Sequence, residues 1–210
     1  MAAEPLRLLA RALDRRVEPP DDAMSERILD AALALAAASG IRNLTMDDVA
    51  RRAGVGRMTV YRRFGEKAHL VDALAVREAR RVLAELDRAA PPDAPIEEQV
   101  VEGFVTSLRL SREHPLLARL ARFEAEGLLA TISADGQALF AAGRAFAAAR
   151  LRAAQAAGVL GEVPVDEVAE VLVRLAASFV LIPETILPVD DDERLRELAR
   201  AIVAPLLTRR

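Results

Sequence analysis

The sequence predicts an all-α protein, for three reasons. The chain of 210 residues is 52% hydrophobic and 29% charged, which is typical of a globular protein rather than a disordered one. Alanine, leucine, arginine and glutamate are abundant, and these residues favour helices. Apolar residues recur at helical spacing, and no useful length of chain alternates apolar and polar residues as a half-buried strand does.

The N-terminal part is predicted to hold a flexible arm followed by a helix. The arm covers residues 1–21 and ends in two adjacent prolines between acidic residues, as solvated arms often do. Apolar residues then repeat at helical spacing, so we expect a helix from about residues 22–25 to Ser39. Gly40 follows the last periodic residue and is the expected C-terminal stop.

Capping signals place the next helices. Thr45, with an acidic residue three positions later, is typical of a helix N-cap, and Gly54 ends the short helix that it opens. A third helix is expected over residues 57–63. A fourth begins near Glu66 and stops at the prolines within residues 91–95.

The remainder is predicted to be helix after helix, with no repeat of fixed period. Only the segment 124–135 gives no readable pattern. The expected helices cover residues 96–113, 116–123, 134–157, 165–182 and 190–207.

Composition excludes several classes of protein. There is no cysteine, so neither a disulfide framework nor a thiolate metal site is expected, which fits a cytoplasmic protein. No uncharged apolar run reaches the roughly 18 residues of a membrane span. Residues 1–13 contain three charged residues and no clean apolar stretch, so they do not resemble a signal peptide.

Charge is distributed unevenly along the chain. The net charge is −3, yet residues 51–67 hold six basic residues and one acidic residue. Residues 71–210 hold 17 basic and 22 acidic residues. A basic region on an acidic body is typical of a site for a polyanion. A solvated helix face gives the same pattern, so charge alone leaves both interpretations open.

The same basic region contains a helix-turn-helix pattern. Two short helices joined by a glycine-containing turn span Thr45 to Arg63. The chain's single tyrosine, Tyr61, and its single lysine, Lys67, lie at the end of this unit. The small apolar residues expected to hold the two helices together are Val49, Ala50, Val55 and Val60.

The polar residues of the second helix are those a DNA-recognition helix presents. Such a helix places its N-terminal residues against base edges in the major groove. Arg57 can bind guanine O6 and N7 with its planar guanidinium, Thr59 can contact phosphate or a thymine methyl group, and Tyr61 can donate to a phosphate oxygen. The outward-facing set is Arg57, Met58, Thr59, Tyr61, Arg62 and Arg63.

Lys67 lies in the first turn of a predicted helix, where the helix dipole disfavours a cation. A nearby phosphate explains a cation there, and pairing with Glu66 is the alternative.

Residues 27–71 resemble the DNA-binding domain of TetR/AcrR-family transcriptional regulators. The resemblance implies phosphate contacts for Thr45, Tyr61 and Lys67. It also implies base contacts for the first, second, third and seventh residues of the recognition helix, which are Arg57, Met58, Thr59 and Arg63. The residues that carry the resemblance are Ile28, Ala31, Ala32, Gly40, Thr45, Val49, Ala50, Ala53, Gly54, Val55, Thr59, Val60, Tyr61, Phe64, Lys67 and Leu70.

One departure from the family pattern concerns the turn. Gly56 stands where the family commonly has a capping serine. Glycine is an acceptable N-cap, so only one possible hydroxyl contact with DNA is in doubt.

The resemblance further implies a helix-turn-helix DNA-binding domain over residues 22–68 and a helical ligand-binding and dimerisation domain over residues 69–210. It implies a homodimer, formed through the helices at 165–182 and 190–207, that binds a palindromic double-stranded DNA operator. A small-molecule effector, which the sequence does not identify, would release the operator, and repression is the family's habit. The candidate dimer core is Val168, Val171, Leu172, Leu175, Phe179, Leu195, Leu198, Ile202 and Leu206. Packing within the monomer alone is the other interpretation of these apolar residues.

An effector pocket is harder to place than the DNA contacts. The candidates are large apolar residues, more than half of which are expected to be ordinary core. They are Phe104, Leu108, Leu120, Phe123, Leu139, Phe140 and Phe146.

Two other classes of function, an enzyme and a protein-interaction scaffold, compete with a regulator. Glu66 and His69 form a Glu-x-x-His motif, but di-iron bundles need two copies, and Ser111 precedes the only other histidine, His114, by three residues. We therefore expect no catalytic residues, no metal and no cofactor. A helical protein-interaction scaffold remains the alternative, although it leaves the basic third helix unexplained.

Overall fold

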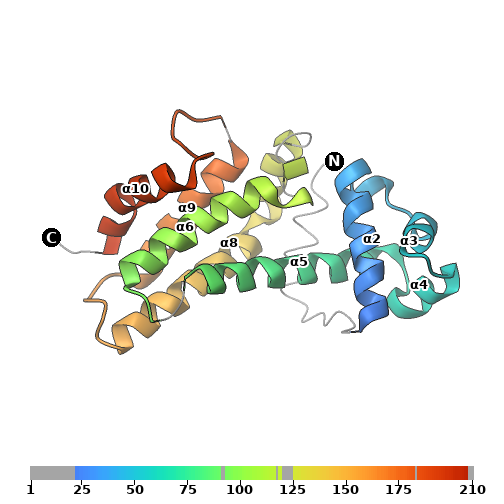
Figure 1. The fold of residues 1–210 in the computed structure, drawn as a ribbon, viewed down its shortest axis with the longest axis horizontal. Coiled ribbons are helices and arrows are strands. Elements are labelled where there is room, and N and C mark those ends of the chain that lie inside the picture. The colour runs from blue at the N-terminus through green and yellow to red at the C-terminus, as the bar shows by residue number, and fades with distance from the viewer. Residues whose placement is uncertain (1–21, 91–92, 117, 120–124, 183, 208–210) are drawn as a thin grey trace. The chain divides into compact units, whose positions relative to one another are not determined.

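The computed structural model describes residues 22–90, 93–116, 118–119, 125–182 and 184–207. Within that part of the chain, all regular secondary structure is helical (Figure 1). This confirms the predicted all-α class. The predicted arm at residues 1–21 lies outside the described residues.

The chain divides into two compact units. Unit 1 comprises residues 1–81 and 114–139, and unit 2 comprises residues 82–113 and 140–210. Helix α5, Lys67–Ala89, contributes to both. Packing therefore places one boundary between the units inside α5, after residue 81. The predicted boundary after residue 68 separates a DNA-binding domain from a ligand-binding domain, and it stays a prediction.

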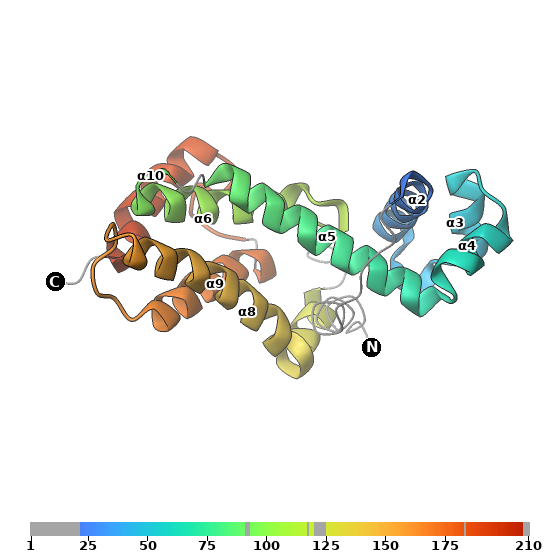
Figure 2. The ribbon, with the colours of Figure 1, turned by 90° about the horizontal axis from the view of Figure 1, so that it is seen from below.

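From residue 22 onward, unit 1 has four elements followed by the first part of α5. They are α2 Ala23–Ser39, the 3-10 helix η1 Ile41–Asn43, α3 Met46–Ala53 and α4 Arg57–Phe64 (Figures 1 and 2). The predicted end of α2, both predicted ends of α3 and both predicted ends of α4 are confirmed to within one residue. The 3-10 helix η1 was not predicted.

Capping explains those ends. The carboxylate of Asp22 accepts hydrogen bonds from the backbone N–H groups of Met24 and Ser25, which opens α2. Gly40, with φ of 86°, and Gly54, with φ of 65°, close α2 and α3 in conformations that favour glycine.

The core of unit 1 is made by apolar residues from α2, η1, α3, α4 and α5. Of the residues predicted to hold the helix-turn-helix together, Val49, Ala50 and Val60 are buried and Val55 is partly buried. Leu70, Val71, Ala73 and Leu74 extend this core along α5.

Unit 2 is built around α6, which contacts both α9 and α10. Besides the end of α5, its helices are α6 Ile96–Glu113, the C-terminal part of α8 Ala125–Ala156, α9 Val165–Leu181, α10 Asp192–Ile202 and the 3-10 helix η2 Ala204–Leu207. Two apolar clusters form its core, and Val100 and Leu172 pack against both.

Two helices differ from their predicted ranges. α8 begins at Ala125 rather than near residue 134, because an existing helix propagates through residues of lower propensity such as Gly127 and Thr131. The predicted helix at 190–207 ends at Ile202 and continues as η2. Pro205 has no N–H to donate to the carbonyl four residues earlier, so the α-helix cannot continue through it. The predicted helix at 116–123 lies mostly outside the described residues.

Candidate DNA interface and effector cavity

The turn between α3 and α4 is fixed by backbone and side-chain hydrogen bonds. Gly54 adopts the left-handed conformation, and the N–H of Val55 donates to the carbonyl of Ala50 over 3.0 Å. Arg27, on α2, donates to the carbonyl of Ala53 over 2.7 Å. That guanidinium satisfies a carbonyl at the end of α3, so α2 also sets where the turn begins.

Thr45 is the N-cap of α3, as predicted. Its hydroxyl oxygen accepts from the N–H of Asp48 at 3.1 Å and donates to the Asp48 carboxylate at 2.6 Å. The hydrogen bond from Thr45 and the charge of Arg51 lower the pKa of Asp48. Thr45 is exposed, so a phosphate contact requires only that its hydroxyl proton turn away from Asp48.

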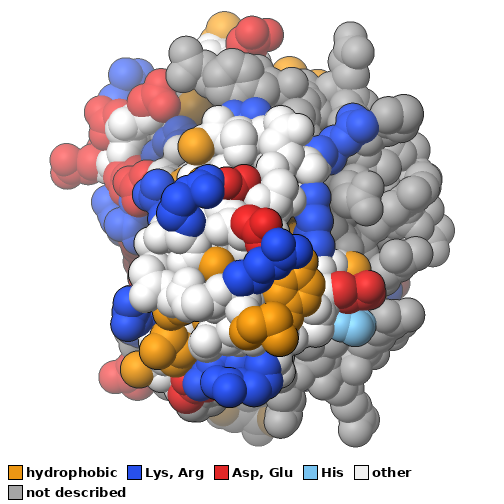
Figure 3. All heavy atoms as spheres, turned by 90° about the vertical axis from the view of Figure 1, so that its right-hand side faces the viewer, with side chains coloured by type: hydrophobic (Ala, Val, Ile, Leu, Met, Phe, Trp, Pro, Cys, Tyr) orange, Lys and Arg blue, Asp and Glu red, His pale blue; other side chains and the backbone are white. Residues whose placement is uncertain are grey.

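Helix α4, the predicted recognition helix, has one buried face and one exposed face. Val60 and Phe64 are buried in the core of unit 1, whereas Arg57, Met58 and Arg62 are exposed. Met58 is 77% exposed, so its side chain takes no part in the core of unit 1. Figure 3 shows basic side chains on this side of the protein with acidic ones between them.

Arg57 is held by two neighbours. Its Nε lies 2.8 Å from the Asp47 carboxylate, in the first turn of α3. Its Nη2 lies 3.4 Å from the Tyr61 hydroxyl, and its guanidinium carbon lies 5.3 Å from the centre of the Tyr61 ring. The hydrogen bond to Tyr61 and the charge of Asp47 raise the pKa of Arg57, which therefore stays protonated. Asp47 was missed as a site residue because its partner lies ten positions away in sequence.

Arg63 is engaged within unit 1. Its Nη1 contacts the Asp22 carboxylate and donates to the Ser25 hydroxyl over 2.8 Å. The Arg63 side chain is 28% exposed. The contact joins the end of α4 to the start of α2, so a base contact by Arg63 would require it to leave these partners.

Lys67 also has a partner in the protein. Its Nζ donates to the carbonyl of Arg42, in η1, over 2.7 Å. Thr59 and Tyr61 are half-buried. The predicted DNA-contacting residues thus lie on α4 and at the starts of α3 and α5, all within unit 1.

A second candidate site is a cavity of about 250 Å³ within unit 2. Most of its lining is apolar and comes from α5, α6, α8 and α9. The larger apolar residues of the lining include Leu83, Leu86, Val100, Phe104, Phe146 and Leu172.

Only some of the predicted effector residues line this cavity. Phe104 and Phe146 line it. Leu108 is buried in the core of unit 2, and Phe140 lies beneath the guanidinium of Arg174, with 5.4 Å between the guanidinium carbon and the ring centre. Leu120 and Phe123 lie outside the described residues, as does the side chain of Leu139. Sequence reasoning missed Gly103, a glycine in a helix interior that also lines the cavity.

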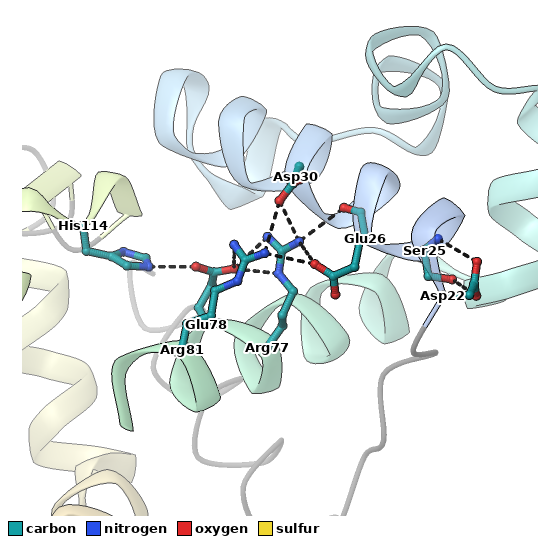
Figure 4. Close-up of polar contacts among 8 residues, drawn as sticks. All are labelled: Asp22, Ser25, Glu26, Asp30, Arg77, Glu78, Arg81 and His114. Atoms are coloured by element: carbon teal, nitrogen blue, oxygen red, sulfur yellow. Dashed lines mark hydrogen bonds and ion pairs between the residues drawn. The ribbon is translucent and has the colours of Figure 1, made fainter. Parts of the chain in front are cut away.

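A charge network with a buried centre joins α2, α5 and the residue that follows α6 (Figure 4). Arg77 is 5% exposed and contacts Glu26, Asp30 and Glu78. Arg77 contacts Oε1 of Glu78, and Nε2 of His114 lies 3.0 Å from Oε2 of the same carboxylate. Burial acts to raise the pKa of Glu78, but the hydrogen bond with His114 and the charge of Arg77 outweigh it and lower that pKa.

Neither a metal centre nor a membrane span was found where the structure describes the chain. Its His, Asp and Glu side chains form no group of three or more that could hold a metal ion. None of its helices combines the length and the apolar character that a transmembrane segment needs.

Comparison with known families identifies the chain. The profile of bacterial regulatory proteins of the tetR family matches residues 28–74, which include the helix-turn-helix. The profile of the bacterial tetracyclin repressor C-terminal domain matches residues 96–205, more than half of the chain. The chain belongs to the TetR family. This confirms the resemblance seen in the sequence, and relatives with assigned roles in this family are transcriptional regulators.

Curated TetR-family relatives match parts of the chain. AqdR of Rhodococcus erythropolis, an HTH-type transcriptional regulator, is 33% identical over 131 residues, which are 62% of this chain and 57% of AqdR. KstR of Mycolicibacterium smegmatis, an HTH-type transcriptional repressor, is 46% identical over 65 residues, which are 31% of this chain and 32% of KstR. These matches therefore span from about a third to just over half of each relative.

Solved structures, one of them of a TetR family repressor, share the fold along most of the chain. The repressor AlkX from Dietzia sp. strain DQ12-45-1b has a TM-score of 0.59 and 24% identity, covering 89% of this chain and 96% of AlkX. GusR of Salmonella enterica has a TM-score of 0.61 and 19% identity, covering 87% of this chain and 94% of GusR.

Replacing Gly56 with serine is expected to stabilise the protein by a few tenths of a kcal/mol. Gly56 is the N-cap of α4 and has an extended backbone conformation that any residue can adopt. A Cβ there would lie 3.8 Å from the Thr59 hydroxyl, which is ordinary contact. Urea denaturation followed by circular dichroism measures the gain.

Gly54→Ala is the matched control for the same turn. Its φ of 65° is left-handed, so alanine there is expected to cost about 1–2 kcal/mol. A serine at residue 56 that destabilised the protein as much as Gly54→Ala would contradict the capping geometry.

Proposed function

We propose that the protein is a DNA-binding transcriptional repressor that acts in the cytoplasm as a homodimer on a palindromic operator. Residues 22–68 bind the DNA, and residues 69–210 dimerise and bind a small-molecule effector that releases it. The observation that carries the proposal is α4, which buries Val60 and Phe64 and exposes Arg57, Met58 and Arg62. This is the arrangement that a recognition helix needs to enter a major groove.

Selection of bound fragments from random double-stranded DNA tests the proposal. We expect enrichment of one inverted repeat whose half-sites lie about one helical turn apart, because two-fold symmetry presents two copies of α4 to successive major grooves. A protein-interaction scaffold would enrich no sequence, and that result would reject the proposal.

Lys67→Ala is expected to weaken binding to all DNA sequences about equally. Loss of one phosphate contact flattens the dependence of log affinity on log salt concentration by about one unit per bound chain. Tyr61→Phe should also weaken binding uniformly, with a smaller effect on the salt dependence because the phenol is neutral. Fluorescence anisotropy at several salt concentrations measures both.

The hydrogen bond from Lys67 to the carbonyl of Arg42 allows a different outcome. If Lys67 acts only inside the protein, Lys67→Ala will lower the melting temperature and leave the salt slope unchanged, which would remove Lys67 from the interface.

The proposed dimer uses the apolar residues that α9, α10 and η2 leave exposed. Val171 is 47% exposed and Ile202 is 58% exposed. Other members of the predicted dimer core pack inside the protomer, among them Val168, which is 8% exposed, and Leu195, which is fully buried. The interface therefore depends on fewer residues than the sequence suggested.

Ile202→Glu is expected to raise the dimer dissociation constant by at least about tenfold, because an unpaired carboxylate would be buried between subunits. Light scattering over a range of protein concentrations measures the change. Ile186→Glu is the matched control, since Ile186 is fully exposed between α9 and α10. A wild-type monomer at micromolar concentration, or equal effects of both variants, would argue against this interface.

A further inference from the structure

Gly103 is a glycine that the packing of unit 2 does not require. It lies in the interior of α6, where glycine is less stable than alanine. A Cβ built on Gly103 meets no described atom within 4 Å. Gly143 differs, because a Cβ there would lie 3.3 Å from the Val173 side chain, so close packing of α8 and α9 favours glycine. Gly103 instead leaves room in the cavity that it lines.

The few polar side chains of the cavity lining already have partners in the protein. Gln99 donates to the carbonyl of Ala94 over 2.8 Å, and Ser107 donates to the carbonyl of Phe104 over 2.7 Å. The Ser107 oxygen is left with lone-pair capacity that can accept one hydrogen bond from a ligand.

Arg150 is the charged residue of the lining, and its charge is balanced. It contacts the Asp87 carboxylate and the carbonyl of Ala90. Its guanidinium carbon also lies 5.8 Å from the centre of the Phe146 ring. An anion in the cavity would have to displace Asp87, and a cation would meet the Arg150 charge. Either ion would lose its hydration among apolar side chains without gaining a new partner.

We propose that this cavity binds an uncharged molecule that is mostly hydrocarbon, with at most one hydroxyl group, and that Gly103 keeps the space for it. The volume of about 250 Å³ is below the usual range for drug-sized ligands, so the molecule is small. The role of this molecule as the effector rests on the proposed function, whereas its binding to unit 2 does not.

Calorimetry with 1-octanol, octanoate and octylammonium tests the chemical class on the full chain without DNA. The three probes share a tail and differ in charge. We expect 1-octanol to bind at least about tenfold more tightly than either ion, because the ions lose hydration without a partner. From 1-hexanol upward, each added methylene should tighten binding roughly threefold to fourfold until the cavity is full. Tightest binding by octanoate, lost in Arg150→Gln, would overturn the proposal.

Gly103→Leu tests the location of the site. We expect it to lose 1-octanol binding by at least about tenfold, because leucine fills the space, while the helix keeps or gains stability. Gly103→Ala, which adds a single methyl group, should fold at least as well and lose less binding. Wild-type binding by a folded Gly103→Leu protein would place the site elsewhere and reject the inference.

Operator release separates the inference from the proposed function. If 1-octanol binds wild-type protein but not Gly103→Leu, and neither protein binds a selected DNA sequence, the cavity assignment stands and the regulatory proposal fails. If the operator is bound but 1-octanol neither binds the protein nor releases the operator, the regulator stands and the cavity assignment fails.

Discussion

Replacing Arg77 with leucine is expected to lower the free energy of unfolding by roughly 3–5 kcal/mol. Arg77 is 5% exposed and holds Glu26, Asp30 and Glu78 in one network (Figure 4). Glu78 is itself 7% exposed, so its carboxylate loses a close partner in a place that little water reaches. The loss of one side of a buried ion pair is far more damaging than the loss of an exposed pair.

Urea denaturation followed by circular dichroism measures this effect. Arg152→Leu is the matched control, because Arg152 pairs with Asp166 and both side chains are more than half exposed. That change is expected to cost about 0–1 kcal/mol. Equal effects of the two substitutions would mean that the network around Arg77 contributes no more than a surface ion pair.

The same network predicts a pH dependence. The pKa of Glu78 is lowered in the folded protein. Its charge therefore contributes stability above the ordinary glutamate pKa of about 4.3, and this stability is lost as the pH falls through the folded-state value. The difference in stability between the wild type and Glu78→Gln should be largest above about pH 5 and shrink in more acidic solution.

Arg57→Ala is expected to cost about 1–3 kcal/mol at one base pair of each half-site and to relax the preference there. Arg57 is exposed on the first turn of α4, where a recognition helix meets base edges. Binding to operators with single base-pair changes, measured at one salt concentration, identifies the position. Equal losses at every position would make Arg57 a backbone contact instead.

Asp47→Asn provides a second test. Loss of the Asp47 charge should strengthen DNA binding, whereas loss of its contact with Arg57 should weaken base discrimination. Asp47 holds the Nε of Arg57 at 2.8 Å, which orients the guanidinium on the exposed side of α4. Removing this acid should strengthen binding to unrelated DNA and steepen its salt dependence. It should also reduce discrimination at the base pair that Arg57 reads. Tighter binding with unchanged discrimination would show that Asp47 acts only through its charge.

Local chemistry explains why much of the fold could be predicted. The residues next to Thr45 and Gly54 in sequence indicate an N-cap and a helix end. The structure has Thr45 as the N-cap of α3 and Gly54 as its left-handed C-cap. The start of α8 was missed because propensity is a weak guide once a helix has formed. The break at Pro205 follows from a known rule, but the apolar periodicity that continues past it concealed the break.

The candidate sites were less predictable because their contacts join distant parts of the sequence. Arg63 reaches the start of α2, and Lys67 reaches the carbonyl of Arg42, so neither partner is visible in a local pattern. The cavity was harder still, since it depends on a side chain that is absent. Periodicity identifies the apolar residues of unit 2, such as Leu108, but not which of them face a void.

Tyr61 gives the unlabelled protein an optical reporter of its own. The chain has no tryptophan and no other tyrosine, so its ultraviolet fluorescence comes almost entirely from this one ring. The ring is half-buried against the core of unit 1 and lies beside the guanidinium of Arg57. Titration with DNA should alter the tyrosine emission in proportion to binding. The Tyr61→Phe variant, which has no tyrosine, is the background control. If a cavity ligand changes the same emission without DNA, its binding alters the surroundings of Tyr61 on α4.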